Sequence, residues 1–422
     1  MLILIAGFLY SCADEKDEEP PRVILESPYE NQTFLTVDTI EVVVGITDNE
    51  QIKSIKVGLV DEDYNDLGIE RSYPASGTSY TLATDFFLEE PFLVSGSYYL
   101  AVRASDGENV GSGYVRVQLT AIERVVENLL VVTANSTQTR VYTGENMGDW
   151  DLKGSYAIDL AGAALNYRQN LLGLAGGIVG DAVFYETEEF MPIQTIAGFG
   201  SPSLPYFVGL EYDLKEERFL LLQRDQQLRV LDKFGVPNSS AQLTANFIPV
   251  KPFPLDTDIF VDQKSITGDT HILSKYASSG LVLNSYSVSG PVREISKRSQ
   301  NESFMWVDGE EGTNMSILNN TNNLVADVYN REGEPLYAAR EIGQGNFIIS
   351  TSGGLLRYTY PSGGTVILNI NLSLKALYYD DLNGFIYGTD GNTLYQISST
   401  GVVIDTYTFN DPIAYFAVDY NR

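Results

Sequence analysis

The C-terminal half of the chain repeats one pattern at intervals of about 41 residues. An Asp follows a short apolar segment in each repeat, and the five positions are Asp213, Asp262, Asp308, Asp380 and Asp419. From the first to the last of these is 206 residues, or about 41 for each of five steps, because the long interval between Asp308 and Asp380 holds two units. A fixed period of this length indicates a row of similar units, each packed against its neighbours.

The last repeat shows what a unit contains. Short apolar strands are predicted there, followed by one more strand near the end of the chain: 377–379, 385–388, 393–397, 402–408 and 414–420. Four strands at a period of about 40–45 residues are typical of β-propeller blades. Residues 125–422 number 298, or about 43 for each of seven blades, so we predict a seven-bladed propeller. Six or eight blades, or a series of two-sheet sandwiches, are the alternatives.

The additional strand at 414–420 suggests how the ring of blades closes. An open ring would leave two unpaired sheet edges, which promote aggregation. We expect 414–420 to join the first blade, which begins with strands at 129–134 and 138–143. The repeated Asp is predicted to cap turns through hydrogen bonds to backbone N–H groups, with a catalytic role as the alternative.

Residues 22–121 show a different pattern, with about seven short alternating strands over about 100 residues. The phrases Asp-Asn-Glu-Gln-Ile-Lys-Ser-Ile at 48–55 and Gly-Ser-Tyr-Tyr-Leu-Ala-Val-Arg-Ala-Ser-Asp-Gly at 96–107 resemble bacterial immunoglobulin-like and fibronectin-type modules. The resemblance implies an Ig-like β-sandwich that acts as a spacer. We therefore predict an all-β chain, with the sandwich over 22–121 and the propeller over 125–422.

The sequence of the N-terminus suggests a targeting signal. Residues 1–11 are an apolar run too short to span a bilayer as a helix, and we interpret them as a signal peptide. Leu-Tyr-Ser-Cys, ending at Cys12, resembles the lipobox of bacterial lipoproteins, and the acidic tether over 12–21 resembles the export signal of surface lipoproteins in Gram-negative glycan-degrading bacteria. These resemblances imply a lipid anchor at Cys12 and an outer-membrane protein exposed at the cell surface. A buried N-terminal strand with an inert Cys is the alternative.

Composition limits the classes of function. The formal net charge is -29, so repulsion between like charges argues against nucleic acids and against sulfated or uronate glycans as partners. One Cys and one His exclude an intramolecular disulfide and zinc sites built from these residue types. His271 has no Gly-x-Ser-x-Gly motif to act with, so a structural role is favoured over that of a catalytic base. No cofactor is expected apart from calcium.

Calcium is suggested by the acidic segment Asp-Glu-Asp-Tyr-Asn-Asp-Leu-Gly at 61–68. Asp61, Asp63 and Asn65 place side-chain oxygens at alternate positions, as calcium-binding loops do. Asp66 stands where such a loop has Gly, and no Glu stands at its twelfth position. A plain acidic hairpin tip is therefore the favoured alternative.

Two aromatic segments are candidate ligand-binding sites. Asp149, Trp150 and Asp151 lie in a long predicted loop, and Trp306 precedes Val307 and Asp308. Sugars stack on aromatic faces, while neighbouring carboxylates accept hydrogen bonds from sugar hydroxyls. Core packing is the favoured alternative for Trp306.

The predicted function is non-catalytic binding of a neutral glycan or of an outer-membrane protein partner on a propeller face. A glycoside hydrolase or lyase is one alternative, since such chemistry needs only two carboxylates, and Asp262 and Asp308 are candidates in the channel. A structural scaffold of an outer-membrane complex is the other. Whether the protein is an enzyme stays open, with a non-catalytic role favoured.

Overall fold

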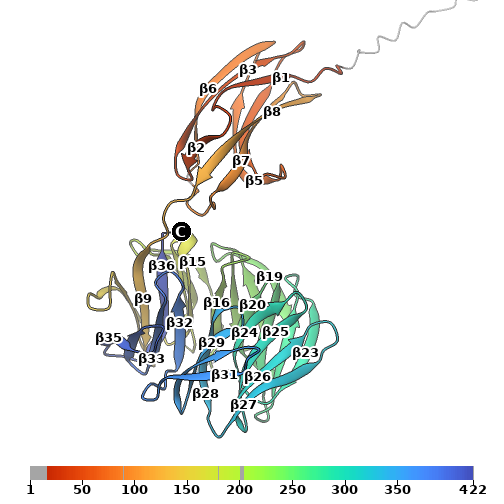
Figure 1. The fold of residues 1–422 in the computed structure, drawn as a ribbon. Helices are drawn as coiled ribbons and strands as arrows, with labels where there is room; N and C mark the ends of the chain where they lie inside the picture. Colours follow the sequence, from red (N-terminus) through yellow and green to blue (C-terminus); the bar gives the residue numbers. More distant parts are fainter. Residues whose placement is uncertain (1–16, 89, 179, 200–203, 422) are drawn as a thin grey trace, which may run out of the picture. The chain divides into compact units, whose positions relative to one another are not determined.

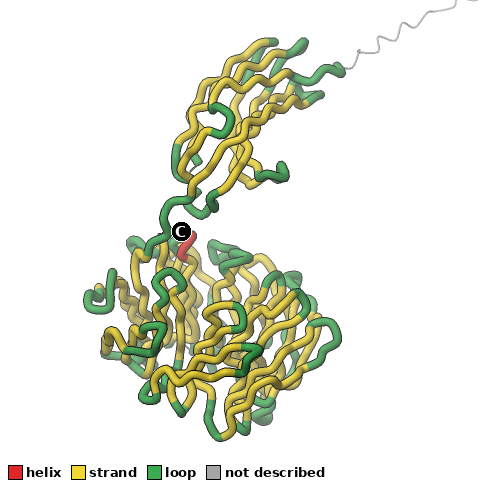
Figure 2. The backbone as a smooth tube through the Cα atoms, in the orientation of Figure 1, coloured by secondary structure: helices red, strands yellow, loops and turns green. Residues whose placement is uncertain are grey.

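The computed structural model describes residues 17–88, 90–178, 180–199 and 204–421, so Cys12 and the predicted signal peptide lie outside the described residues. The chain divides into two compact units, Met1–Glu123 and Arg124–Arg422. The described elements are strands and one short 3-10 helix, Tyr167–Gln169, which confirms the all-β prediction (Figure 2). Within the described residues, no helix has the length and apolarity that crossing a membrane requires.

Unit 1 contains two sheets that share one hydrophobic core (Figure 1). Alternation along Thr39–Thr47 buries Ile40, Val42, Val44 and Ile46 on the inner face of the smaller sheet. The larger sheet includes one parallel pair, β2 with β8. In strand order, the sheets are β1(Arg22–Ser27)-β3(Thr39–Thr47)-β6(Ser79–Phe87) and β2(Gln32–Leu35)-β8(Val110–Thr120)-β7(Gly96–Ser105)-β4(Ser54–Val60)-β5(Asp66–Pro74).

In unit 2, the described residues form seven antiparallel sheets of four strands each. Their strand orders are β36(Ile413–Tyr420)-β9(Val126–Ala134)-β10(Thr139–Gly144)-β11(Asp151–Tyr156), β12(Leu160–Asn166)-β13(Leu171–Gly176)-β14(Ala182–Glu186)-β15(Pro192–Ile196), β16(Phe207–Asp213)-β17(Arg218–Gln223)-β18(Gln227–Leu231)-β19(Pro237–Gln242), β20(Phe247–Leu255)-β21(Asp258–Ser265)-β22(His271–Tyr276)-β23(Val282–Val288), β24(Val292–Ser299)-β25(Glu302–Gly309)-β26(Gly312–Asn319)-β27(Val325–Glu332), β28(Leu336–Gly343)-β29(Asn346–Thr351)-β30(Gly354–Thr359)-β31(Gly364–Asn369) and β32(Ala376–Asp380)-β33(Phe385–Asp390)-β34(Thr393–Ile397)-β35(Val403–Thr408).

The first strands of these sheets meet in a closed ring. Each first strand contacts the next one around the ring, in the order β12, β16, β20, β24, β28, β32 and β36. The ring closes because β36 also contacts β12. The predicted pairing of the C-terminal strand is confirmed, because β36 pairs antiparallel with β9, with Ala417 opposite Leu130. Unit 2 is therefore a β-propeller, and each sheet's apolar faces pack against those of its neighbours.

The repeated Asp residues do not all occupy equivalent positions. Asp213 and Asp380 end first strands and accept hydrogen bonds from the backbone N–H groups of the following turns, as predicted. Asp262 and Asp308 lie instead on the second strands β21 and β25. The expectation of one common position is wrong for these two because each has a further strand before it in its sheet, β20 before Asp262 and β24 before Asp308.

Side chains on second strands connect neighbouring sheets. Asp262 Oδ2 accepts a hydrogen bond from the Val292 N–H at 3.2 Å, and Asp308 Oδ1 accepts one from the Leu336 N–H at 2.9 Å. Ser350 Oγ accepts a corresponding bond from the Leu374 N–H at 2.7 Å. Each bond satisfies a backbone donor at the entry to the next sheet, where the sheet's own ladder offers no partner.

Candidate ligand-binding sites

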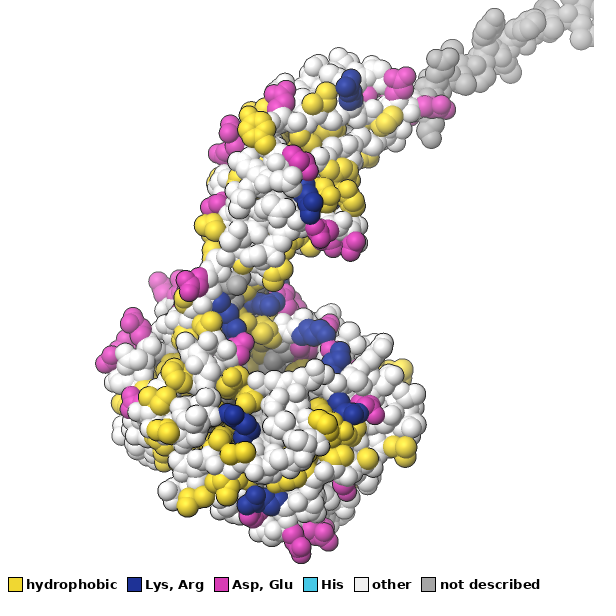
Figure 3. Space-filling view, in the orientation of Figure 1, with side chains coloured by type: hydrophobic (Ala, Val, Ile, Leu, Met, Phe, Trp, Pro, Cys, Tyr) yellow, Lys and Arg dark blue, Asp and Glu magenta, His cyan; other side chains and the backbone are white. Residues whose placement is uncertain are grey.

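The centre of the ring contains a cavity of about 430 Å³ that is lined by residues from all seven first strands. Because every sheet of unit 2 contributes residues to this cavity, it is a candidate ligand-binding site. Four cationic side chains and two carboxylates line it, namely Lys251, Arg293, Arg340, Lys375, Glu211 and Glu294. Lys and Arg side chains border the hollow of unit 2 on the face that Figure 3 shows. Hereafter we call this cavity the channel site.

Glu211 on β16, Lys251 on β20, Glu294 on β24 and Arg340 on β28 form the charged centre of the channel site. Arg340 Nη1 lies 3.8 Å from Glu294 Oε1. Among the described residues, the side chains of Glu211 and Lys251 form no hydrogen bond and no close ion pair, and Lys251 Nζ lies 5.0 Å from the centre of the Phe253 ring. Their polar atoms are therefore available to a ligand in the cavity.

The channel wall changes the acidity of the two carboxyl groups. Burial raises the pKa of Glu211, and the charge of Glu294 raises it further, while Lys251 and Arg340 lower it. Burial likewise raises the pKa of Glu294 against the opposing effects of Arg340 and Lys251. The Arg340 side chain is 44% accessible because it faces the cavity, and the charge of Glu294 raises its pKa. Both carboxyl groups therefore hold a proton more readily than surface glutamates do.

Phenol groups complete the channel lining. The Tyr415 hydroxyl on β36 accepts a hydrogen bond from the Leu165 N–H at 3.0 Å, which leaves its own proton free to donate. Burial raises the pKa of Tyr415, so the phenol stays protonated at neutral pH. Lys375 Nζ lies 3.1 Å from the centre of the Tyr337 ring, a cation–π contact that holds this ammonium at the wall.

A second cavity, of about 520 Å³, lies beside Trp150 in the loop between β10 and β11. Trp150 Nε1 donates to the Met147 carbonyl at 2.9 Å, and the indole packs against Phe409 with ring centres 5.2 Å apart. These contacts fix the ring while it lines the cavity. Other lining side chains are polar or aromatic: Asn128, Thr143, Glu145, Asp149, Asp151, Lys153 and Tyr407. The structure therefore brings Asp149, Trp150 and Asp151 together, and we call this cavity the Trp150 pocket.

Trp306 and Asp308 have structural roles. Trp306 is fully buried, with Phe347 and Tyr358 each 5.4 Å away between ring centres. Its ring faces are covered, so the prediction that it binds a ligand is wrong. Asp308 Oδ2 accepts a hydrogen bond from Arg293 Nη2 at 2.8 Å, in addition to its bond from the Leu336 N–H. This carboxylate connects two sheets and is not free for a ligand.

The carboxylates Asp262 and Asp308 also fail as a catalytic pair. Asp262 is fully buried, and its Oδ1 lies 2.9 Å from His271 Nδ1. His271 is itself buried by this contact, in agreement with the structural role that the sequence favoured. The carboxylates that do face the channel are Glu211 and Glu294, which the sequence analysis missed. A charged residue inside the largely apolar strand β16 is a signal that could have found Glu211, whereas β24 is rich in charged residues and gives no such signal for Glu294.

The proposed calcium ligands in unit 1 are engaged in a turn. Asp61 Oδ1 accepts hydrogen bonds from the N–H groups of Asp63 and Asn65 at 2.9 and 2.8 Å, and its Oδ2 accepts one from Asn65 Nδ2 at 2.9 Å. These bonds build the β4–β5 hairpin tip and lower the pKa of Asp61. They occupy the Asp61 carboxylate with N–H donors, as expected of the plain hairpin tip that the sequence favoured over calcium binding.

A different carboxylate group of unit 1 could hold a cation. Asp17, Asp48 and Asp106 offer one oxygen each within 4.8 Å of one another, the only such group among the described residues. Burial raises the pKa of Asp48, and the neighbouring charges of Asp106 and Asp17 add to this effect. Asp106 already accepts hydrogen bonds from the Glu108 and Asn109 N–H groups.

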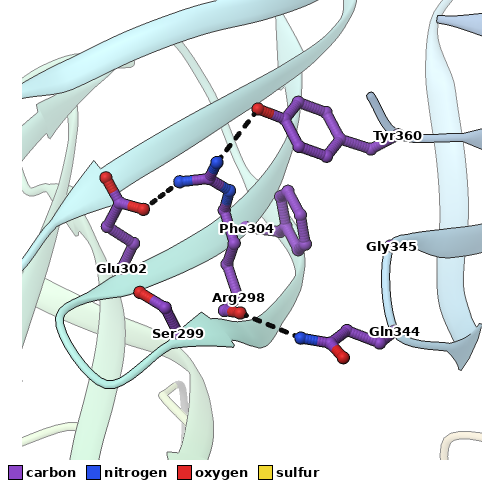
Figure 4. Close-up of a pocket in the computed structure, with 7 residues that line it drawn as sticks. All are labelled: Arg298, Ser299, Glu302, Phe304, Gln344, Gly345 and Tyr360. Carbon is purple, nitrogen blue, oxygen red and sulfur yellow. Dashed lines mark hydrogen bonds and ion pairs between the residues drawn. The ribbon is translucent and has the colours of Figure 1, made fainter. Parts of the chain in front are cut away.

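A third cavity, of about 330 Å³, lies between β24–β25 and the sheet that contains β29 (Figure 4). The Arg298 guanidinium points into it and is already paired with Glu302. Arg298 Nη2 also donates to the Tyr360 hydroxyl at 3.2 Å, and Gln344 Nε2 donates to the Arg298 carbonyl at 3.2 Å. Since its polar groups bind one another, this groove is a packing feature between sheets.

No known family model and no curated protein matches the chain. Among solved structures, the WD40 β-propeller domain of Doa1 is 12% identical with a TM-score of 0.48, covering 63% of this chain and 88% of that domain. A quinonprotein alcohol dehydrogenase-like protein from Bacteroides thetaiotaomicron is 11% identical with a TM-score of 0.48, covering 94% and 99%. The computationally designed Ika8 protein is 9% identical with a TM-score of 0.47, covering 75% and 94%. None of these likenesses bears on function.

Proposed function

We propose that the chain is a lipid-anchored protein of the outer membrane, exposed at the cell surface, whose role is non-catalytic binding of a neutral glycan. The localisation follows from the resemblance of residues 9–12 to a lipobox and of the acidic tether behind Cys12 to a surface-export signal. The anchor leaves the rest of the chain outside the bilayer, where it can reach extracellular polysaccharide. A protein partner in the same membrane is the alternative ligand.

Each part of the chain has a role in this proposal. Residues 22–121 are an Ig-like spacer, supported by the two-sheet topology in which β1 pairs with β3 and β2 pairs with β8. The seven four-stranded sheets over 125–422 are seven propeller blades, supported by the ring of contacts among their first strands. A rigid ring suits a binding role because its loops are held at fixed positions.

The observation that carries the binding role is the Trp150 pocket. Its indole is fixed by Met147 and Phe409, and it lies next to the exposed carboxylates Asp149 and Asp151. An aromatic wall beside hydrogen-bond acceptors matches a sugar ring, which offers C–H groups on its faces and hydroxyls at its edge. The volume of about 520 Å³ is in the range of small-ligand pockets.

Affinity electrophoresis through gels that contain neutral polysaccharides tests this role with the detergent-solubilised full-length protein. We expect one polysaccharide to retard the protein and Trp150→Ala to abolish the retardation. Because Trp150 also packs on Phe409, Asp151→Ala is the second test. Among the described residues, this exposed carboxylate has an ion pair with Lys153 alone, so its loss weakens binding without loss of folding. Tyr29→Ala, which removes an exposed aromatic ring of unit 1, is the control and leaves the retardation unchanged. Retardation that survives both pocket variants would exclude this site.

A glycoside hydrolase or lyase is the second candidate function. The observation in its favour is that Glu211 and Glu294 both line the channel site and that the charge of Glu294 raises the pKa of Glu211. Two carboxyl groups in different protonation states are what glycosidic cleavage requires. Release of new reducing ends, abolished by Glu294→Gln, is the result that would favour this function over binding alone.

A further inference from the structure

The channel site reverses the charge balance of the whole protein. The chain has 56 acidic and 27 basic residues, a ratio of about two to one. The channel lining has four cationic side chains against two carboxylates, the opposite ratio. The negative exterior repels anions, whereas the cationic side chains of the cavity attract them, so this lining favours an anionic ligand over an uncharged one.

The cations differ in how far they are already neutralised. Arg293 is bound to Asp308, and Lys375 rests on the Tyr337 ring. Lys251 has no close ion pair among the described residues and lies 5.0 Å from the centre of the Phe253 ring, whereas the ion pair of Arg340 with Glu294 is long, at 3.8 Å, and its guanidinium lies 5.9 Å from the centre of the Tyr378 ring. Lys251 and Arg340 are therefore the groups that a ligand's negative charge can approach, and both act on Glu211 and Glu294 across the cavity.

We propose that the channel site binds a small hydroxylated carboxylate, of the chemical class of sugar acids. Its carboxylate faces Lys251 and Arg340, which bind carboxylates through charge-assisted hydrogen bonds. Its hydroxyls face Glu211 and Glu294 as acceptors and the Tyr415 phenol as donor. A volume of about 430 Å³ accommodates a ligand of this size within the ring. This site is separate from the Trp150 pocket and does not depend on the function proposed for that pocket.

The charges that line the channel change the conclusion that the net charge suggested about uronates as ligands. A net charge of -29 argues against long uronate glycans lying along the surface. It does not argue against a small acid inside the channel, because the field there is set by the nearest charges. Salt screens exposed charges more strongly than enclosed ones, so binding in the channel persists at physiological ionic strength.

Isothermal titration calorimetry on the full-length protein in detergent tests the proposal with three probes. D-glucuronate carries both the carboxylate and the hydroxyls, D-glucose lacks the carboxylate, and acetate lacks the hydroxyls. We expect glucuronate to bind at least tenfold more tightly than either of the others. Equal affinities for glucuronate and glucose, equal affinities for glucuronate and acetate, or no heat of binding with glucuronate would each overturn the proposal.

Two substitutions locate the binding. Lys251→Gln removes a cation that has no close ion pair among the described residues, so we expect a normal melting temperature and an affinity for glucuronate at least tenfold lower. Arg340→Gln has the same expected effect on affinity. Lys264→Gln is the matched control, since Lys264 lies on the neighbouring strand β21 and pairs with the exposed Asp269 outside the channel. An unchanged affinity in folded Lys251→Gln, or an equal loss in Lys264→Gln, would contradict the assignment.

Discussion

The Tyr420 hydroxyl donates a hydrogen bond to Asp380 Oδ1 across 2.9 Å, and both side chains are buried. Tyr420 lies on β36, which pairs with β9 of the first sheet, whereas Asp380 ends the first strand of the last sheet. The bond therefore joins the two sheets that come from opposite ends of unit 2. It fixes the point at which the ring of sheets closes.

Replacing Tyr420 with Phe removes this bond while keeping the ring that packs in the core. We expect the free energy of unfolding of unit 2 to fall by about 1.5–3 kcal/mol, the usual contribution of a hydrogen bond to a charged group. Asp380 keeps its bonds from the Leu382 and Asn383 N–H groups, so folding itself survives. Denaturant titration followed by fluorescence measures the change. Tyr395→Phe is the control, because Tyr395 is a partly buried tyrosine of the last sheet, which also contains Asp380. An equal loss of stability in both variants would contradict the closing role of Tyr420.

The second-strand bonds between sheets predict a graded loss of stability. Asp308→Ala removes bonds from both Arg293 and the Leu336 N–H, whereas Ser350→Ala removes only the bond from the Leu374 N–H. We expect the free energy of unfolding to fall by about 3 kcal/mol or more in Asp308→Ala and by about 1 kcal/mol in Ser350→Ala, as measured by denaturant titration. Glycan retardation should persist in folded Asp308→Ala. Loss of retardation in folded protein would restore Asp308 as a ligand-binding residue.

Asp419 predicts a pH dependence of stability. Burial, with a smaller contribution from Glu127, raises the pKa of Asp419 to about 7 from its usual 3.8. The folded state therefore holds a proton that the unfolded state releases, and stability falls as the pH rises from about 4 to about 7. The loss in the free energy of unfolding is of the order of 4 kcal/mol. It is constant above about pH 7 and absent below the pKa that Asp419 has in the unfolded chain.

Asp419→Asn tests this assignment. The advantage of the variant over the native protein in free energy of unfolding should grow between about pH 4 and about pH 7 and then level off. Asp390→Asn, at an exposed position of β33, should show no such pH-dependent advantage. An advantage of Asp419→Asn that is equal at every pH would contradict the raised pKa.

Binding in the channel site should also depend on pH. Glu211 faces Lys251, Glu294, Arg340 and Tyr415, and its pKa is raised, as is that of Glu294. As the pH rises above their usual pKa of 4.5, these carboxyl groups lose protons and repel the ligand's carboxylate more strongly. We expect calorimetry to show weaker glucuronate binding at about pH 8 than at about pH 5, and a smaller difference in Glu211→Gln. Tighter binding at the higher pH would contradict this sign.

Local signals were sufficient for much of the fold. Strands β32, β33 and β34 lie within a residue or two of their predicted positions because each is short, apolar and bounded by Gly or Asp turns. β20 was missed because Pro249, Pro252 and Pro254 cannot donate to a β-ladder. The structure accommodates them because β20 is an inner edge strand that pairs only with β21.

The candidate sites were harder to predict from the sequence than the fold was. Asp149, Trp150 and Asp151 are neighbours in the chain, so their grouping could be predicted. Glu211 and Glu294 lie on different sheets, 83 residues apart in the chain, and only the closed ring brings them to one cavity. Trp306 was a candidate ligand-binding residue for which core packing was favoured, and packing between two neighbouring sheets does bury it.

Retardation in polysaccharide gels and release of reducing ends, measured together on the same samples of full-length protein, test the central proposal most directly. Non-catalytic binding predicts retardation by a neutral glycan, loss of that retardation in Trp150→Ala and Asp151→Ala, and no increase in reducing ends. New reducing ends that disappear in Glu294→Gln would contradict it and establish catalysis in the channel. Absence of both signals with every glycan would contradict glycan binding and leave a membrane protein as the partner.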